Sequence, residues 1–229
     1  GRGNNEIAKK MKLTIRKIHK YLSLFISLQL LLWTISGIYF AYNKIEMIRG
    51  EHLRNSQDGQ IVFNLQDVPK LEATSITAFI RLGHPVLKIE TKEGIIYKDT
   101  AGLAVQPIDS IQAMEIVDTK TSLNSISAQE IFETPRGSEY RGRNLPLFQV
   151  ITDHKKNINA YVDGMTGEIV AIRSSGWRIW DFMWSLHIMD YIERDNINNL
   201  LMKIFSVLAL ISSLSGVVLF FTTQKKVTS

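Results

Sequence analysis

Apolar residues gather in two long stretches that contain no charged residue. Residues 21–43 read YLSLFISLQLLLWTISGIYFAYN, and residues 204–224 read IFSVLALISSLSGVVLFFTTQ. A bilayer core about 30 Å thick is crossed by about 20 apolar residues in a helix. Both stretches reach that length, so we predict transmembrane helices over 21–43 and 199–222.

A buried core helix is another interpretation of both stretches, and a cleaved signal peptide is another interpretation of the first stretch alone. Core helices are usually shorter. A signal peptide has an apolar region of about 7–15 residues that ends at small residues, whereas bulky Tyr39, Phe40 and Tyr42 end this stretch. The pattern therefore favours a retained membrane anchor.

Between the two stretches, polar and apolar positions follow a duplicated pattern. The segments HPVLKIETKEGIIYKDTAGLAVQPI, from His84, and LPLFQVITDHKKNINAYVDGMTGEIVAI, from Leu145, each hold an alternating run, a polar turn, a Tyr-x-Asp strand and a glycine turn. These features predict antiparallel meanders. We expect helices over 74–82, 109–117 and 125–133, the last because Ser127 and Glu130 are spaced as in a capping box. The predicted fold is an α+β domain, duplicated and inserted between two transmembrane helices.

Charge adds an orientation to this picture. Residues 1–20 and 223–229 together carry +8 and residues 44–203 carry −3, which accounts for the +5 of the 229-residue chain. Basic flanks stay in the cytoplasm. We therefore predict a two-pass bacterial inner-membrane protein with cytoplasmic tails 1–20 and 223–229 and a periplasmic domain over 44–176. The basic KKMKLTIRKIHK is then a juxtamembrane anchor, and no nucleic-acid partner is expected.

The stretch WRIWDFMWSLHIMDY, residues 177–191, is unusually rich in tryptophan. Trp and Tyr concentrate where membrane meets water, so we predict an interfacial segment over 177–198. If the stretch is helical, one stripe holds Trp180, Trp184, His187 and Tyr191. Such a stripe suits a flat apolar macrocycle with the imidazole as axial ligand. The plainer interpretation of His187 is an aromatic-belt residue, and that of His19 is an interfacial anchor.

Several short motifs resemble one protein family in their order. YVDGMTGEIVA resembles the signature of PepSY domains, and RKIHKYLSLFISLQLLLWTISGIYF resembles the first helix of PepSY-associated transmembrane proteins. WDFMWSLHIMDY followed by LSGVVLF resembles the second Leu-His segment and the next helix of that family. The resemblance runs from about residue 14 to 222. Larger relatives have four or more membrane helices, and some are inner-membrane ferric-siderophore reductases that carry haem on membrane histidines.

The resemblance implies haem b as cofactor, with His19 and His187 as axial ligands and Trp180, Trp184 and Tyr191 around it. The other histidines do not match the family motifs and read as turn or surface residues: His52, His84 and His154. Small residues mark close helix packing in lipid, and the candidates are Ser36, Gly37, Ser215 and Gly216. The chain has no cysteine, which excludes disulfides, zinc–thiolate and iron–sulfur sites and thiol nucleophiles.

The favoured function is haem-based electron transfer across the membrane, for periplasmic iron (ferric-siderophore) or flavin reduction. A cytoplasmic NAD(P)H or flavin reductase would supply the electrons, because the chain has no flavin or nicotinamide fingerprint. A homodimer in membrane lipid would give each haem two histidines, while His52 or Met189 is the competing outer ligand. The alternatives are a non-catalytic PepSY binding or inhibitory module and an accessory subunit of a larger membrane complex. No catalytic residue is assigned.

Overall fold

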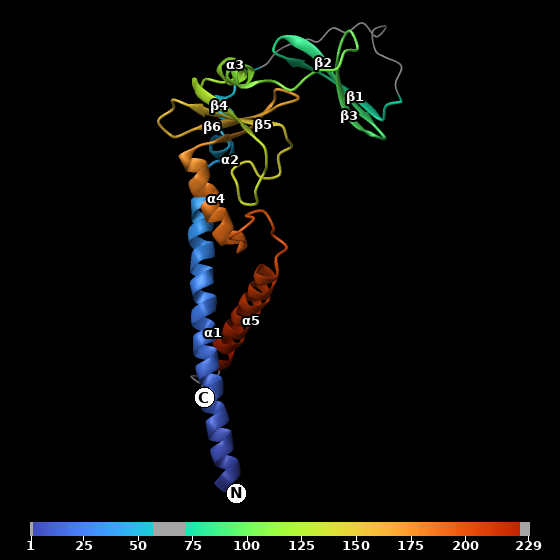
Figure 1. The fold of residues 1–229 in the computed structure, drawn as a ribbon. Helices are drawn as coiled ribbons and strands as arrows, with labels where there is room; N and C mark the ends of the chain where they lie inside the picture. Colours follow the sequence, from blue (N-terminus) through green and yellow to red (C-terminus); the bar gives the residue numbers. More distant parts are fainter. Residues whose placement is uncertain (1, 57–71, 225–229) are drawn as a thin grey trace. The chain divides into compact units, whose positions relative to one another are not determined.

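The computed structural model describes residues 2–56 and 72–224, and it divides the chain into two compact units (Figure 1). One unit combines the two ends of the chain, residues 1–42 and 181–229. The other is continuous, Asn43–Trp180. Each unit is described by itself.

The unit formed by the chain ends is helical. Helix α1 runs over Arg2–Tyr42, so the predicted basic tail and the predicted first span form one continuous helix. Its part Ser23–Tyr42 is long and apolar enough to cross a membrane. Helix α5, Leu200–Gln224, packs on α1 through Phe25 and Phe205, whose ring centroids lie 4.9 Å apart.

The second predicted span, 199–222, coincides with α5, but its described side chains end at Leu214. Over Leu200–Leu214 the helix is apolar but shorter than a membrane span. The crossing of the membrane by α5 therefore stays a prediction, as do the two-pass topology and the periplasmic position of residues 44–176.

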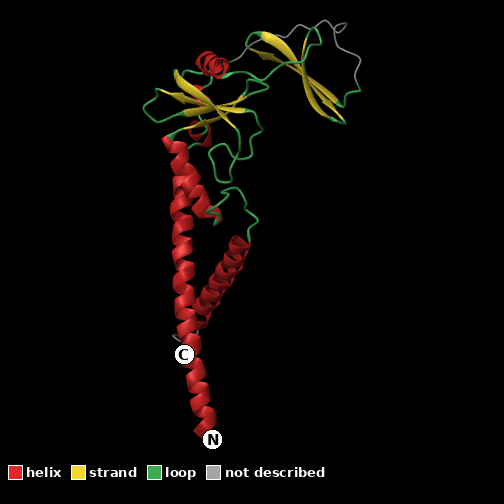
Figure 2. Ribbon diagram, viewed as in Figure 1, coloured by secondary structure: helices red, strands yellow, loops and turns green. Residues whose placement is uncertain are grey.

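The unit Asn43–Trp180 holds two antiparallel sheets (Figure 2). The first is a three-stranded meander of β1 (Ser75–Arg81), β2 (His84–Thr91) and β3 (Gly94–Asp99). The second has the order β4 (Ser125–Ile131), β5 (Leu147–Thr152), β6 (Asn159–Asp163), β7 (Ile169–Arg173). The helical elements are α2 (Ile45–Ile48), η1 (Glu51–Leu53), α3 (Ser110–Lys120) and the start of α4 (Ser175–Ile188). The expected α+β class with antiparallel meanders is confirmed.

Two of the three expected helices are wrong. Residues 74–82 form β1 and residues 125–133 contain β4. The first run is rich in β-branched residues, which pack well in a sheet, and in both runs pairing with the next strand satisfies the backbone and outweighs the short helix signals. The spacing of Ser127 and Glu130 was therefore accidental. The third helix is confirmed, and its capping box is formed by Asp109 and Gln112.

The two meanders share one pattern but end differently. In each, the Tyr-x-Asp strand lies beside the preceding strand, with Tyr97 opposite Lys88 and Tyr161 opposite Gln149. After Gly167 a complete strand, β7, follows. After Gly102 the chain makes only an isolated bridge between Ala104 and Lys98. The second copy is therefore the more complete sheet.

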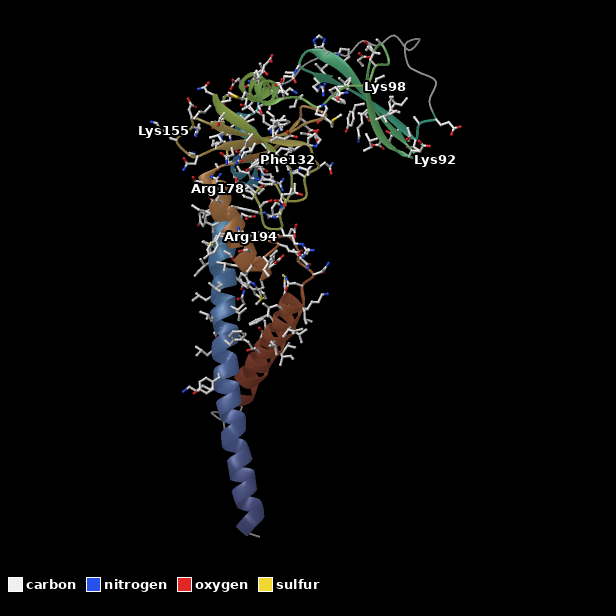
Figure 3. All side chains as sticks on the ribbon, viewed as in Figure 1. Lys92, Lys98, Phe132, Lys155, Arg178 and Arg194 are labelled. Carbon is white, nitrogen blue, oxygen red and sulfur yellow. The ribbon has the colours of Figure 1, made fainter. Side chains whose placement is uncertain are left out.

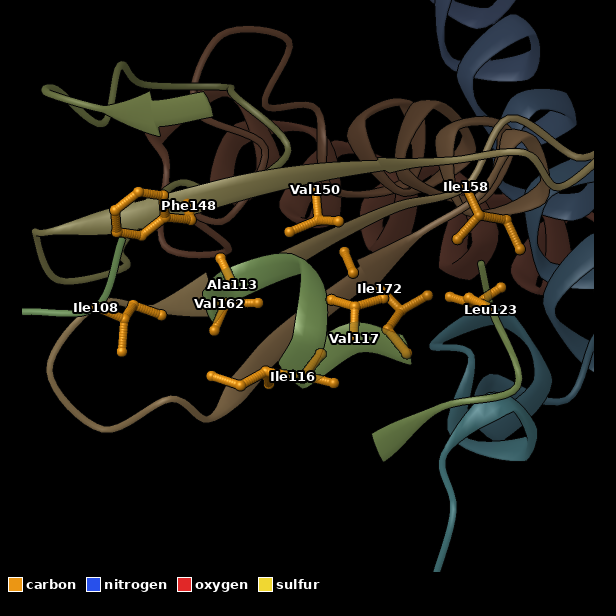
Figure 4. Packing of buried hydrophobic residues seen from close by; sticks show 12 residues of the cluster. Ile108, Ala113, Ile116, Val117, Leu123, Phe148, Val150, Ile158, Val162 and Ile172 are labelled. Atoms are coloured by element: carbon orange, nitrogen blue, oxygen red, sulfur yellow. The ribbon is translucent and has the colours of Figure 1, made fainter. Parts of the chain in front are cut away.

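The main hydrophobic core lies between α3 and the second sheet (Figure 4). Helix α3 contributes Ala113, Ile116 and Val117, all nearly inaccessible to solvent. The sheet contributes the inward-facing positions of β5, β6 and β7, namely Phe148, Val150, Ala160, Val162, Ile169 and Ile172. Gly167 is required here, since a Cβ would lie 2.9 Å from Ile116 Cδ1 and its φ of +66° disfavours other residues.

This packing predicts a large difference between two isoleucines of the same helix. Ile116 is 1% exposed, whereas Ile111 is 77% exposed. Ile116→Ala should lower the free energy of unfolding by about 2–5 kcal/mol, because it removes buried methylenes and leaves a cavity. Ile111→Ala, the matched control, should change it by less than about 0.5 kcal/mol. Urea unfolding of the full chain in detergent measures both, and equal effects would contradict the core assignment.

Candidate functional site

The candidate site lies at the C-terminal end of α4, where His187 packs against α1. Both residues of every contact of His187 and of the last turn of α4 belong to the unit formed by residues 1–42 and 181–229. On α1, Gln29, Trp33, Ser36 and Phe40 follow one another at spacings of four, three and four, so they share one face of the helix. The sequence analysis selected only Ser36 from this set.

The end of α4 explains why α1 carries polar residues at membrane depth. The last four carbonyl groups of a helix have no hydrogen-bond partner within the helix. In α4, all four accept a hydrogen bond from a group outside the helix. The N–H of Asp190 donates to Ser185 O (3.1 Å) and Gln29 Nε2 to Leu186 O (3.4 Å). Trp33 Nε1 donates to His187 O at 2.7 Å, and Asn199 Nδ2 donates to Ile188 O at 2.8 Å.

The imidazole of His187 lies among aromatic rings. Its ring centroid is 5.5 Å from that of Phe40 in an edge arrangement and 6.4 Å from that of Trp33. Trp184, one turn earlier on α4, is nearly parallel to it, with 13° between the planes and 6.3 Å between the centroids. These contacts leave His187 half-buried among apolar rings and fix the orientation of its imidazole.

Ser36 decides which imidazole nitrogen carries the proton. Its Oγ lies 2.8 Å from His187 Nδ1, 2.8 Å from Leu32 O and 3.1 Å from Trp33 O, and the side chain has no solvent exposure. A hydroxyl has one proton, and the two carbonyl groups can only accept it. We infer that the hydroxyl donates to a carbonyl group one turn earlier, as Ser side chains in helices commonly do, and that its oxygen accepts from Nδ1–H.

Neutral His187 consequently has its lone pair on Nε2. Within the described part of the chain, no hydrogen bond to Nε2 is found. A histidine that binds a metal commonly has one ring nitrogen held by a hydrogen bond while the other coordinates. The arrangement around His187 fits an axial ligand of haem in this respect.

The loop after α4 fixes the end of the helix. Met189 has a φ of +56°, so α4 stops at Ile188. Asp181 is buried and pairs with Arg194 at 2.9 Å across the loop. The stripe expected from Trp180 to Tyr191 therefore ends at His187, and Tyr191 is 50% exposed beyond the helix.

Asp190, Glu193 and Asp195 bring carboxylate oxygens within 4.8 Å of one another in the same loop. The Asp190 carboxylate already accepts backbone N–H groups of the four loop residues Ile192, Glu193, Asp195 and Asn196. Burial alone would raise the pKa of Asp190, but these hydrogen bonds together lower it. The cluster therefore organises the loop.

The remaining predicted residues have different outcomes. Trp180 is half-buried on α4. A Cβ added at Gly37 would meet no atom within 4 Å among the described residues. The side chains of His19 in α1 and of Ser215 and Gly216 in α5 lie outside the described residues. The roles of these residues stay predictions.

The other histidines belong to the unit Asn43–Trp180. His84 opens β2 and is exposed. His52 and His154 both line a cavity of 340 Å³, a juxtaposition that the sequence did not reveal. Lys156 N–H donates to His154 Nδ1 at 3.2 Å, so the turn between β5 and β6 is partly organised by this imidazole.

Comparison with known proteins gives one family. The family model described as PepSY-associated TM region matches residues 16–228, which is nearly the whole chain. No curated protein and no solved structure matches the chain.

The hydrogen bond to Ser36 predicts the tautomer of His187. In the protein without cofactor at neutral pH, ¹⁵N NMR of histidine-labelled protein should show Nδ1 protonated and Nε2 unprotonated, with His187→Gln to assign the signals. Ser36→Ala removes the acceptor and should weaken this preference toward the tautomer mixture expected of a solvent-exposed imidazole, for which His84 is the internal reference. A signal from His187 with the proton on Nε2 would contradict the inferred geometry.

Proposed function

The chain belongs to the PepSY-associated TM region family, and from this membership and the geometry of His187 we propose a haem-binding electron-transfer protein of the bacterial inner membrane. The observation that carries the proposal is the Ser36 hydrogen bond, which leaves His187 Nε2 as a free base within an aromatic wall. Ionisable residues at membrane depth are seldom without a function.

Each neighbour of His187 has a definable part in this proposal. Ser36 holds the Nδ1 proton and so keeps Nε2 available for iron. Trp33, Phe40 and Trp184 limit rotation of the ring and keep water away from it. When bound, haem supplies a one-electron couple whose potential depends on its axial ligands and their hydrogen bonds.

His19 and His187 cannot bind the same iron. Ser36, which contacts His187, follows His19 by 17 residues on the continuous helix α1. That separation corresponds to about 26 Å at 1.5 Å per residue. The two histidines therefore belong to two levels of the membrane, one for an inner haem and one for an outer haem.

A homodimer supplies the second ligand at each level. Low-spin haem in electron transfer takes two strong axial ligands, and a two-fold axis presents each histidine to its own copy. The open side of Gly37 is compatible with a second helix at close range. Electrons would enter from a cytoplasmic NAD(P)H or flavin reductase and leave toward periplasmic ferric-siderophore or flavin.

The haem content of variants tests the assignment. His187→Ala should remove about half of the haem and His19→Ala the other half, since each substitution empties one level. The matched control is His84→Ala, because His84 lies on an exposed strand end. This variant should retain the full haem content. The Soret band and the pyridine haemochrome give the content per chain, and light scattering gives the oligomeric state.

The expected result for the unmodified chain is one haem per chain in a dimer. A monomer that keeps its full haem content after both substitutions would overturn the ligand assignment. Purified protein without a Soret band, even after reconstitution with haem, would instead favour the non-catalytic module or the accessory subunit.

The proposed topology is tested separately with alkaline-phosphatase fusions. A fusion after Lys155, at the exposed turn between β5 and β6, should be active because the enzyme folds only outside the cytoplasm. A fusion at Ser229 should be inactive, since basic flanks keep both ends inside. Activity at Ser229 would show that the chain crosses the membrane an odd number of times.

A further inference from the structure

Two histidines that the haem proposal does not use line one cavity of the unit Asn43–Trp180. His52 belongs to η1 and His154 to the turn between β5 and β6, and the cavity that both line has a volume of 340 Å³. All of its lining residues belong to this one unit. We call it the histidine cavity.

The side of the histidine cavity that carries His52 is fixed on the second sheet. Gly50, just before η1, is buried with a φ of +73°, and a Cβ there would lie 2.8 Å from Cγ2 of Ile172 in β7. Arg54, just after η1, donates from Nη2 to Ile169 O at 2.7 Å. Because η1 is held at both ends, the cavity has a defined wall on this side.

The turn that carries His154 forms the other side and is also fixed. Lys156 N–H donates to His154 Nδ1 at 3.2 Å, and Lys156 O accepts from N and Oγ of Ser175 at 2.9 and 3.0 Å. A neutral imidazole holds one proton. Because Nδ1 accepts a hydrogen bond, that proton lies on Nε2. His154 therefore offers an N–H donor, the reverse of the tautomer inferred for His187.

The lining of the histidine cavity is partly basic and partly aliphatic. Its basic residues are His52, His154 and Lys156, and among the lining residues that the structure describes none is an aspartate or a glutamate. Its aliphatic residues are Met47, Ile48, Leu53, Ile158 and Ile172. Ile158 and Ile172 are also buried members of the main core (Figure 4). Such a lining suits a ligand that has an anionic group at one end of an apolar chain.

We propose that the histidine cavity binds a medium-chain carboxylate, a fatty acid of about eight carbons. The carboxylate accepts hydrogen bonds from His154 and His52, and Lys156 supplies the opposite charge. The chain packs on the aliphatic residues. A volume of 340 Å³ equals about eleven waters at about 30 Å³ each, which matches a ligand of about ten non-hydrogen atoms such as octanoate.

Two other ligand classes fit this lining less well. A transition metal requires the lone pair of a ring nitrogen, whereas Nδ1 of His154 already accepts a hydrogen bond and Nε2 carries the proton. A small inorganic anion would leave the aliphatic part of the cavity to water, which finds no polar partners there. The inference depends neither on haem nor on the position of this unit relative to the membrane.

Nuclear magnetic resonance of the full chain, labelled with ¹⁵N-histidine and purified in detergent, tests the inference. Sodium octanoate should shift the imidazole signals of His52 and His154 in one saturable step and leave that of exposed His84 in place. Affinity should rise about fourfold for each methylene from butanoate to octanoate, because each is buried in the cavity. It should rise no further with dodecanoate, since the cavity is then full, whereas partition into detergent continues to increase with chain length.

Two neighbouring lysines provide matched variants for the same titration. Lys156 lines the cavity, whereas Lys155, at the tip of the same turn (Figure 3), is not among the lining residues. Lys156→Gln should weaken octanoate binding about fivefold, as an exposed ion pair does. Lys155→Gln should leave it unchanged. Both lysines are exposed, so the two variants keep the core intact.

Several outcomes would overturn the inference. Equal binding of the neutral octanamide would show that the charge is not recognised, and equal binding of acetate would indicate an adventitious anion only. Tighter binding of N-acetylleucine than of octanoate would assign the cavity to peptide C-termini. Equal losses in the two lysine variants, or signals of His52 and His154 that do not move, would show that octanoate does not enter the cavity.

Discussion

The site depends on one constraint, which is that the four carbonyl groups at the end of α4 must all find hydrogen-bond partners. Two of their partners, Gln29 and Trp33, are side chains of the apolar part of α1, Ser23–Tyr42. An unsatisfied carbonyl in hydrocarbon costs several kcal/mol. Because these hydrogen bonds fix the end of α4 on one face of α1, they also bring Ser36 to His187 and thereby select the tautomer of the imidazole.

Sequence patterns predicted the parts of this arrangement that are local. Period-two alternation identified β2, β3, β5 and β6, because neighbouring strands in a meander satisfy the backbone of each other. It failed at β1 and β4, where short helix signals such as Ser127 and Glu130 were outweighed by pairing with the next strand. Local propensity is a weak guide when a sheet edge is available nearby.

The long-range contacts of the site could not be read from the sequence. Ser36 was identified as a small packing residue, yet it acts through its hydroxyl group on a histidine 151 positions later. Gln29 offered a signal, since a polar amide in a charge-free apolar stretch needs a partner. Its partner, however, is a backbone carbonyl, and backbone groups leave no trace in the pattern of side chains. The aromatic stripe was expected to continue to Tyr191, but the positive φ of Met189 ends the helix before that residue.

Helix α4 is held at both ends, and this matters for any function of His187. At its start, Ser175 N and Oγ donate to Lys156 O, and Arg178 Nη1 donates to Asn157 O, so the turn of the second meander holds the first residues. At its end, the four carbonyl partners hold the last turn. The pair of Asp181 with Arg194 ties the middle of α4 to the loop that follows it. A ligand on a helix is positioned more precisely than one on a loop.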